Sequence, residues 1–130
     1  MQKPHKRTNR VMVFGVFDLL HEGHRKFLVA AGSHGGKLIV EVARDEVVRM
    51  LKNKSPRWSE KERVAALRQS KFVDRVVLGD KVQGTYGVIR RCKPHIICLG
   101  YDQNVLAKDL ASRMASGQIP LIKFVYLLAY

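Results

Sequence analysis

The feature that most limits the possible folds of this 130-residue chain is the alternation of short apolar runs with longer amphipathic segments. Each apolar run is rich in Val, Ile and Leu and almost unbroken, which is typical of parallel strands buried on both faces. Between the runs, apolar residues recur at helical spacing. We expect strands at 11–15, 37–43, 75–79, 95–100 and 121–126, and helices at 24–31, from 45, from 59, at 86–91 and at 105–116. We expect Asp45 to cap the second helix, whose buried face is Val47, Val48 and Leu51.

Strands that alternate with helices predict an α/β fold: a Rossmann-like, doubly wound sandwich, with a five-stranded parallel sheet and helices on both faces. Because crossovers between parallel strands are right-handed, we expect the strand order 3-2-1-4-5. Ligands in such sheets bind beyond the carboxyl ends of the strands where the order reverses, here between the first and fourth strands. Two polar loops meet there, at 17–24 and 100–103.

Length and composition favour one domain at 11–130, preceded by a basic flexible tail at 1–10. Cys92 and Cys98 lie in apolar runs without metal-ligand spacing, which favours buried, reduced thiols and a cytoplasmic location. We expect no secretory signal and no membrane span, because charged residues interrupt the apolar runs well short of about 20 residues. The apolar ending at 124–130 favours a homodimer.

Positive charge dominates the composition. The chain has 24 Lys and Arg against 11 Asp and Glu, a formal net charge of +13. This excess favours an acidic or phosphorylated partner, although solubility or general nucleic-acid affinity would also explain it. No helix-turn-helix, RNP or zinc spacing supports a specific nucleic-acid site. We therefore rank nucleic-acid binding below binding of a small phosphorylated ligand.

The first predicted strand leads directly into a loop with two histidines. Gly15 ends the strand, and His21 and His24 stand three residues apart where the first helix begins, with Gly23 between them. Backbone N–H groups at a helix N-terminus attract anions, so this is a position where phosphate can bind. Both imidazoles can face one pocket, and Gly23 leaves room for a ligand. The stretch therefore predicts a phosphate-binding site.

A second candidate element is the basic region that follows the second predicted strand. A run of charges is usually a solvated surface. Here Pro56 interrupts the helical pattern, and Ser59 with Glu62 forms a capping box that opens the next helix. A loop of this kind could close over a triphosphate. Its cations are Arg49, Lys52, Lys54, Arg57, Lys61, Arg63 and Arg68.

The run Gly15-Val16-Phe17-Asp18-Leu19-Leu20-His21-Glu22-Gly23-His24 resembles the HxGH signature of the nucleotidyltransferases, the cytidylyltransferase-like branch of the HUP superfamily. The resemblance covers about 11–102. Within the family, 42–46 and 93–103 are most similar to archaeal-type FAD synthases, which transfer AMP from ATP to FMN. The run 17–21 is equally similar to glycerol-3-phosphate cytidylyltransferases, which use CTP and glycerol 3-phosphate.

The resemblance implies an enzyme that joins NMP from an NTP to a small phosphomonoester and releases pyrophosphate. It implies Mg²⁺ bound with the NTP, and we expect no metal-ligating set of side chains. The implied catalytic residues are His21, His24, Arg63 and Lys54, with His24 at the α-phosphate and Arg63 on phosphates. The implied nucleotide-binding residues are Gly15, Val16, Phe17, Gly23, Asp102 and Lys52. Lys52 and Lys54 compete for the family's lysine position. Asp18 either anchors its loop or helps to hold magnesium through water.

Two departures from the family pattern keep an alternative open. Val16 stands where many members have threonine, so only its backbone N–H can bind a ligand. The sequence ends at Tyr130, before the family's Ser/Thr-rich segment, so either the sequence is truncated or the triphosphate is held less fully. Both departures suggest a nucleotide-binding module without turnover as the alternative.

Overall fold

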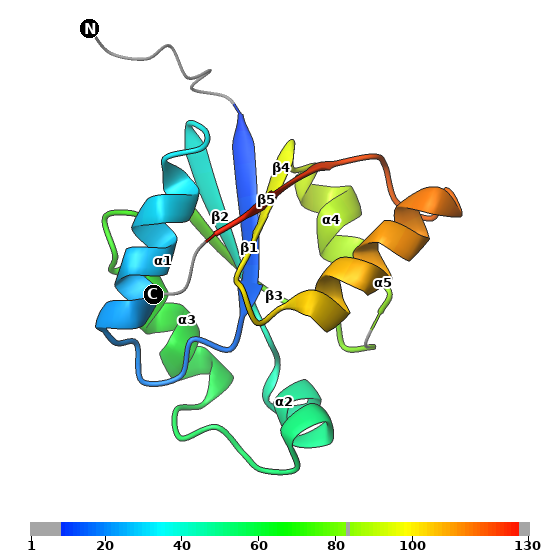
Figure 1. The fold of residues 1–130 in the computed structure, drawn as a ribbon. Helices are drawn as coiled ribbons and strands as arrows, with labels where there is room; N and C mark the ends of the chain where they lie inside the picture. Colours follow the sequence, from blue (N-terminus) through cyan, green and yellow to red (C-terminus); the bar gives the residue numbers. More distant parts are fainter. Residues whose placement is uncertain (1–8, 83, 128–130) are drawn as a thin grey trace, which may run out of the picture.

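A parallel five-stranded sheet forms the centre of the molecule (Figure 1). We describe it from a computed structural model, which covers residues 9–82 and 84–127. The strand order is β3-β2-β1-β4-β5, and every neighbouring pair is parallel, which confirms the predicted topology. The strands are β1 (Arg10–Gly15), β2 (Lys37–Val42), β3 (Arg75–Leu78), β4 (Ile96–Leu99) and β5 (Lys123–Tyr126). The helices are α1 (Glu22–Gly32), α2 (Asp45–Lys52), α3 (Glu60–Arg68), α4 (Gly87–Cys92) and α5 (Asn104–Ala115).

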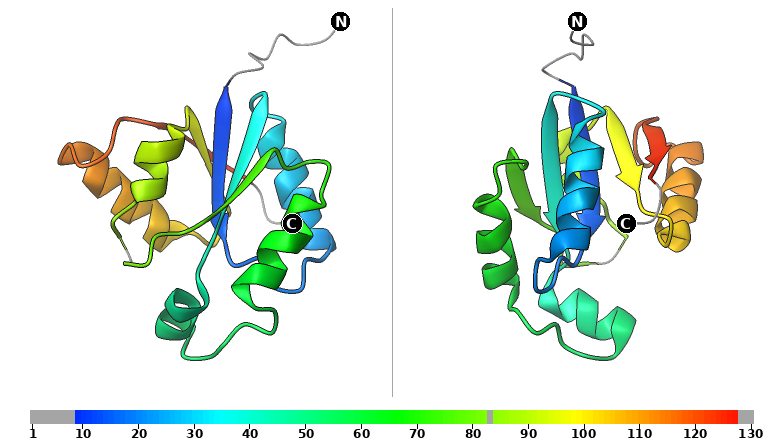
Figure 2. Two further views of the ribbon diagram at one scale, coloured as in Figure 1. Left: turned by 180° about the vertical axis from the view of Figure 1, so that it is seen from behind. Right: turned by 60° about the vertical axis from the view of Figure 1, so that its left-hand side comes forward.

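Helices cover both faces of the sheet, as Figure 2 shows. Alternate side chains of β1 point to opposite faces, so Val11 and Val13 belong to one core and Met12 to the other. The first core includes Leu28 of α1 and Leu67 of α3. The second core is completed by α4 and α5. Both cysteines are buried and free, as expected.

The α2 helix lies beyond the carboxyl ends of the strands (Figure 1), and its burial differs from our expectation. Val47 and Val48 are buried as predicted, but the prediction for Leu51 was wrong, because its side chain is 63% exposed. The helix has eight residues and lies outside the two main layers. Little apolar surface of the rest of the protein is therefore available to cover its last turn, which includes Leu51. Asp45 was also predicted to cap this helix. The N-cap is instead Arg44, and the Asp45 side chain bonds elsewhere.

The two ends of the chain lie partly outside the described residues, so most of the predicted tail and the last three residues of the apolar ending cannot be compared. Arg10, which we assigned to the tail, is the first residue of β1. Its backbone N–H donates to Nδ1 of His95 at 3.0 Å, and its Nε donates to the Lys93 carbonyl at 2.9 Å. No helix within 9–82 and 84–127 is both long and apolar enough to cross a membrane.

The backbone ladder between β1 and β4 is short. Backbone pairing of these strands is limited to Val11 with Ile96 and Met12 with Ile97, whereas β1 pairs with β2 as far as Gly15. The carboxyl halves of β1 and β4 are therefore not paired through their backbones. This is the place where the strand order reverses and where we expected a ligand.

An acidic side chain also lies within the sheet. Glu41 of β2 stands between Phe14 of β1 and Val77 of β3, and a Cβ added to Gly79 would lie 2.6 Å from its Oε2. Burial, and after it the charge of Asp80, raise the pKa of Glu41 from 4.5 to about 7. The folded protein therefore holds a proton here that the unfolded chain releases at lower pH.

We expect Glu41→Gln to remove a pH dependence of stability. The stability that this proton provides is fully present below pH 4.5 and is lost as pH rises through about 7, because the ionised carboxylate is disfavoured in the folded state. The shift corresponds to at most about 3 kcal/mol. Urea unfolding at pH 5 and pH 8 should show the variant gaining stability relative to wild type at the higher pH. Glu46→Gln, at an exposed position of α2, is the control. An equal difference at both pH values for Glu41→Gln would contradict the prediction.

Candidate active site

The loops that carry the predicted site residues lie at one end of the sheet. Figure 1 shows the connections β1 to α1, β2 to α2, α2 to α3 and β4 to α5 at the carboxyl ends of the strands. This agrees with the general rule for doubly wound sheets. The topology therefore brings together residues that are far apart in the sequence.

The two histidines cap α1 and stack on each other. His21 is the N-cap, and its Nδ1 accepts from the backbone N–H groups of Gly23 at 3.1 Å and His24 at 3.4 Å. Nδ1 of His24 accepts from the backbone N–H of His21 at 3.2 Å. The ring centroids are 3.7 Å apart with an interplanar angle of 16°. Sequence reasoning missed this cap, although the three-residue spacing is that of a capping box.

These bonds fix the protons of both rings. A nitrogen that accepts from a backbone N–H carries no proton of its own, so each neutral imidazole bears its hydrogen on Nε2. Burial, followed by the charges of His21 and Arg25, lowers the pKa of His24 to about 4, while Asp18 acts in the opposite direction. His24 is therefore neutral at pH 7. It can donate one hydrogen bond from Nε2 to an anionic oxygen without carrying a positive charge.

Phe17 supports His24 from within the loop. Its ring is buried and meets the His24 ring edge-on at a centroid distance of 5.4 Å. A Cβ added to Gly15 would lie 2.7 Å from the Phe17 ring, so glycine is needed for this close approach. Phe17 and Leu19 both have positive φ, at 55° and 51°, which is uncommon for such side chains and marks a strained loop.

Arg63 lies inside the protein rather than on a flexible surface loop. Its side chain is completely buried, and four of its five N–H groups are used. Nη1 donates to the carbonyls of Val16 at 2.9 Å and Ala43 at 2.7 Å, Nε donates to the Trp58 carbonyl at 3.1 Å, and Nη2 donates to Asp45 Oδ1 at 2.5 Å. Arg63 thus joins the loops after β1 and β2 to the start of α3. Its phosphate contact stays a prediction, and these bonds indicate a positioning role.

Asp18 anchors the basic segment to the histidine loop. Its two carboxylate oxygens accept from the backbone N–H groups of Arg57 at 2.8 Å and Trp58 at 2.9 Å. Burial acts to raise the pKa of Asp18, but the N–H groups of Trp58 and Arg57 and the charge of Arg63 hold it below its usual value. Of the two roles considered from the sequence, the geometry supports anchoring.

The two candidate lysines are exposed at the end of α2 and just after it. Lys52 ends the helix, Asn53 turns the chain with φ 56° and ψ 32°, and Lys54 comes next. Within the described residues, neither lysine makes a hydrogen bond or ion pair. Both are therefore cations available to a ligand, and the choice between them stays open.

The loop after β4 is fastened to the end of β1 by Gln103. Its Nε2 donates to the Phe14 carbonyl at 2.8 Å, and its Oε1 accepts from the backbone N–H of Gly100 at 2.8 Å. The loop with exposed Tyr101 and Asp102 is thereby held at the end of β1, the strand that leads into the histidine loop. The role of Gln103 was missed, because the sequence offers only a polar residue next to Asp102.

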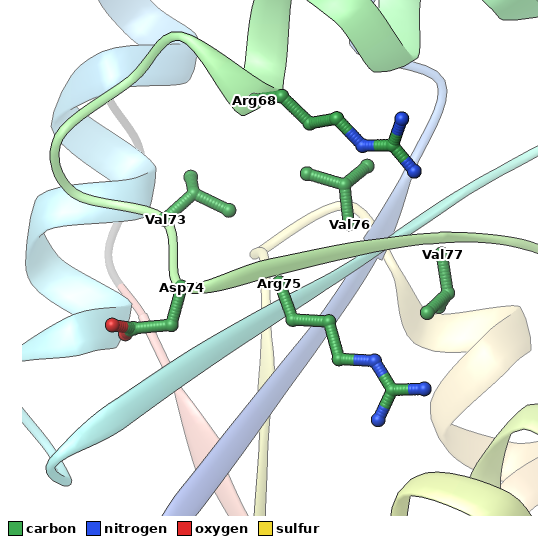
Figure 3. A pocket seen from close by; sticks show the side chains of 6 residues that line it. All are labelled: Arg68, Val73, Asp74, Arg75, Val76 and Val77. Carbon is green, nitrogen blue, oxygen red and sulfur yellow. The ribbon is translucent and has the colours of Figure 1, made fainter.

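A separate hollow of about 580 Å³ lies at the free edge of the sheet, along β3 (Figure 3). Arg68 from α3 and Arg75 from β3 line it, together with Val73, Asp74, Val76 and Val77. It contains none of the implied catalytic or nucleotide-binding residues, although Arg68 belongs to the basic region, and it is not at the carboxyl ends of the strands. We therefore place the chemistry at the histidine pair rather than in this hollow.

The fold and the site define an α/β protein with paired imidazoles at the carboxyl ends of the strands of a doubly wound sheet. A family model described as "Cytidylyltransferase-like" matches residues 12–128. The chain belongs to this family, and it is a nucleotidyltransferase by class, as the sequence resemblance implied.

Individual relatives agree with this assignment. The chain is 37% identical over 130 residues to a FAD synthase of Thermococcus onnurineus, covering 97% of this chain and 87% of the relative. It is 43% identical over 117 residues to a FAD synthase of Korarchaeum cryptofilum, covering 85% and 78%. A solved structure named as the lipopolysaccharide core biosynthesis protein of Thermoplasma volcanium superposes with a TM-score of 0.84 at 38% identity, covering 94% of this chain and 98% of that one.

Proposed function

We propose that this protein is a FAD synthase, which transfers AMP from ATP to FMN and releases pyrophosphate. The observation that carries the proposal is the stacked histidine pair at the start of α1, in which His24 is neutral at pH 7. The similarity to archaeal FAD synthases supports FMN and ATP as the substrates.

The proposed reaction forms one P–O bond and breaks another. An oxygen of the FMN phosphate attacks the α-phosphorus of ATP, and the bond from that phosphorus to the bridging oxygen of the β-phosphate breaks. The attacking oxygen is already anionic, so no general base is required. This fits His24, whose pKa of about 4 suits a hydrogen-bond donor and whose Nδ1 is occupied by the backbone of His21. Orientation and electrostatic stabilisation then provide the rate enhancement.

Positive charge for the triphosphate would come from the exposed lysines Lys52 and Lys54. We propose that Mg²⁺ arrives with the nucleotide and neutralises part of its phosphate charge. Among the described residues, no group of three or more His, Cys, Asp or Glu side chains is placed to hold a metal. Asp18 already accepts two backbone N–H bonds and is a poor magnesium ligand in this arrangement.

A product-identified assay tests the proposal. The protein is incubated with Mg²⁺ and either ATP with FMN or CTP with glycerol 3-phosphate, and products are identified by mass spectrometry alongside pyrophosphate release. FAD formation is the expected result. CDP-glycerol would establish the cytidylyltransferase alternative instead. A thermal shift with ATP or CTP but no product from either pair would establish a nucleotide-binding module without turnover.

We also propose a homodimer in the cytoplasm. Exposed apolar side chains at Leu121 and Tyr126 near the end of the described chain support self-association, and the free thiols of Cys92 and Cys98 fit a reducing compartment. Size-exclusion chromatography with light scattering distinguishes one copy of 14.8 kDa from two.

A further inference from the structure

Two acidic residues fasten the starts of α2 and α3 to each other. The backbone N–H of Asp45 donates to Glu60 Oε1 at 2.8 Å, and the backbone N–H of Glu60 donates to Asp45 Oδ2 at 3.1 Å. We call this reciprocal pair the Asp45–Glu60 clasp. Each carboxylate serves an N–H group in the first turn of the other helix, where such groups lack intrahelical partners and the helix dipole favours negative charge.

Two arginines, Arg44 and Arg63, connect the clasp to neighbouring loops. Glu60 Oε2 lies 3.8 Å from Arg44 Nη1, and Asp45 Oδ1 accepts from buried Arg63. Arg44 in turn donates from Nε to the Gly79 carbonyl at the end of β3, at 2.7 Å. The two helix starts are therefore held against the loops that follow β2 and β3.

The clasp joins the two ends of a basic segment, which consists of most of α2 and the connection to α3. Asp45 and Glu60 are 15 positions apart, and the segment 46–59 between them carries Arg49, Lys52, Lys54 and Arg57. Close to its far end, this segment is held a second time, by Asp18 of the histidine loop. Fixing both ends of a connection limits the positions that the residues between them can reach. The exposed lysines are thereby kept near the carboxyl ends of the strands.

We propose that Glu60 is a positioning residue, which holds the segment 46–59 so that its lysines meet the phosphates of a nucleotide bound at the histidine pair. This inference rests on the proposed function. Glu60 does not touch the substrate, since a carboxylate would repel a triphosphate and both of its oxygens already face partners in the protein. Its effect passes through Asp45 and the lysines.

The first test compares ATP affinity in Glu60 variants by isothermal titration calorimetry. Glu60→Ala opens the clasp and should weaken ATP binding by about tenfold to a hundredfold, because small displacements of binding groups have large effects. Glu60→Gln keeps an acceptor oxygen for the Asp45 N–H and should stay within about threefold of wild type. Glu46→Ala removes the same charge from an exposed position of α2 and should leave the affinity unchanged. Equal affinity in wild type and Glu60→Ala would overturn the proposal.

A double-mutant cycle separates positioning from general stabilisation. If Glu60 acts through the lysines, Lys52→Ala or Lys54→Ala should weaken ATP binding strongly in the wild-type background and only slightly in the Glu60→Ala background. Fully additive effects for both lysines would overturn the proposal.

If Glu60→Ala does not fold, Glu60→Asp takes its place, since it keeps the charge but shortens the side chain. Because the readout is ATP binding, a wild-type protein that binds ATP without making FAD would contradict the proposed function and still test the clasp.

Discussion

Replacing His24 with alanine is expected to lower the rate of AMP transfer by about 10²–10³-fold, the range seen when one oxyanion donor is removed from an active site. The variant loses the Nε2 hydrogen-bond donor that we place at the α-phosphate, and with it the ring that stacks on His21 at 3.7 Å. Steady-state pyrophosphate release with ATP and FMN measures the effect. Undiminished turnover in a folded variant would remove His24 from the mechanism.

Two further variants identify the origin of the loss. His34→Ala changes an exposed histidine in the turn after α1 and should leave turnover unchanged. His24→Gln retains an N–H donor near the position of Nε2 and should recover part of the rate.

Because the pKa of His24 is about 4, protonation of this ring should reduce the rate only near that pH. A loss of rate with a midpoint near 6.5 that disappears in His24→Gln would contradict the neutral donor.

Replacing Arg63 with methionine is expected to destabilise the fold by about 3–5 kcal/mol, as when one partner of a buried ion pair is removed. The substitution leaves the carbonyls of Val16, Ala43 and Trp58 and the Asp45 carboxylate without their shared donor. For a domain of this size, the melting temperature should fall by roughly 10–20 °C. Thermal unfolding followed by circular dichroism is the measurement.

The matched control is Arg68→Met on the same helix. Arg68 is exposed at the end of α3, and its replacement should change the melting temperature by little. If Arg63 acted mainly by contacting phosphates, Arg63→Met would instead keep the wild-type melting temperature and lose only ATP affinity. The two roles therefore give opposite patterns in two simple measurements.

Much of the fold could be predicted from local sequence patterns. The unbroken apolar runs identified each strand, and right-handed crossovers then left few possible orders, so β3-β2-β1-β4-β5 followed. The capping box of Ser59 and Glu62 is local and was recognised correctly. The neighbouring positions of His21 and His24 also follow from their three-residue spacing at the start of one helix.

What the sequence could not supply depends on contacts between distant segments. Arg63 was predicted among mobile cations because its neighbours are charged, but its four acceptors lie on β1, β2 and α2 loops that only the fold brings together. Leu51 fits the apolar stripe of α2, yet no layer of the protein covers it. The prediction that Asp45 caps its own helix was wrong, because its carboxylate accepts from the backbone N–H at the start of α3 instead.

The bridge made by Gln103 has a consequence for the loop that carries Asp102. Beyond Met12 and Ile97 no backbone ladder joins β1 to β4, and one amide side chain links them by binding the Phe14 carbonyl and the Gly100 N–H. The loop after β4 is therefore attached to the end of β1 through one side chain. We expect a residue without this amide to release the loop after β4 from the end of β1 while leaving the imidazoles in place.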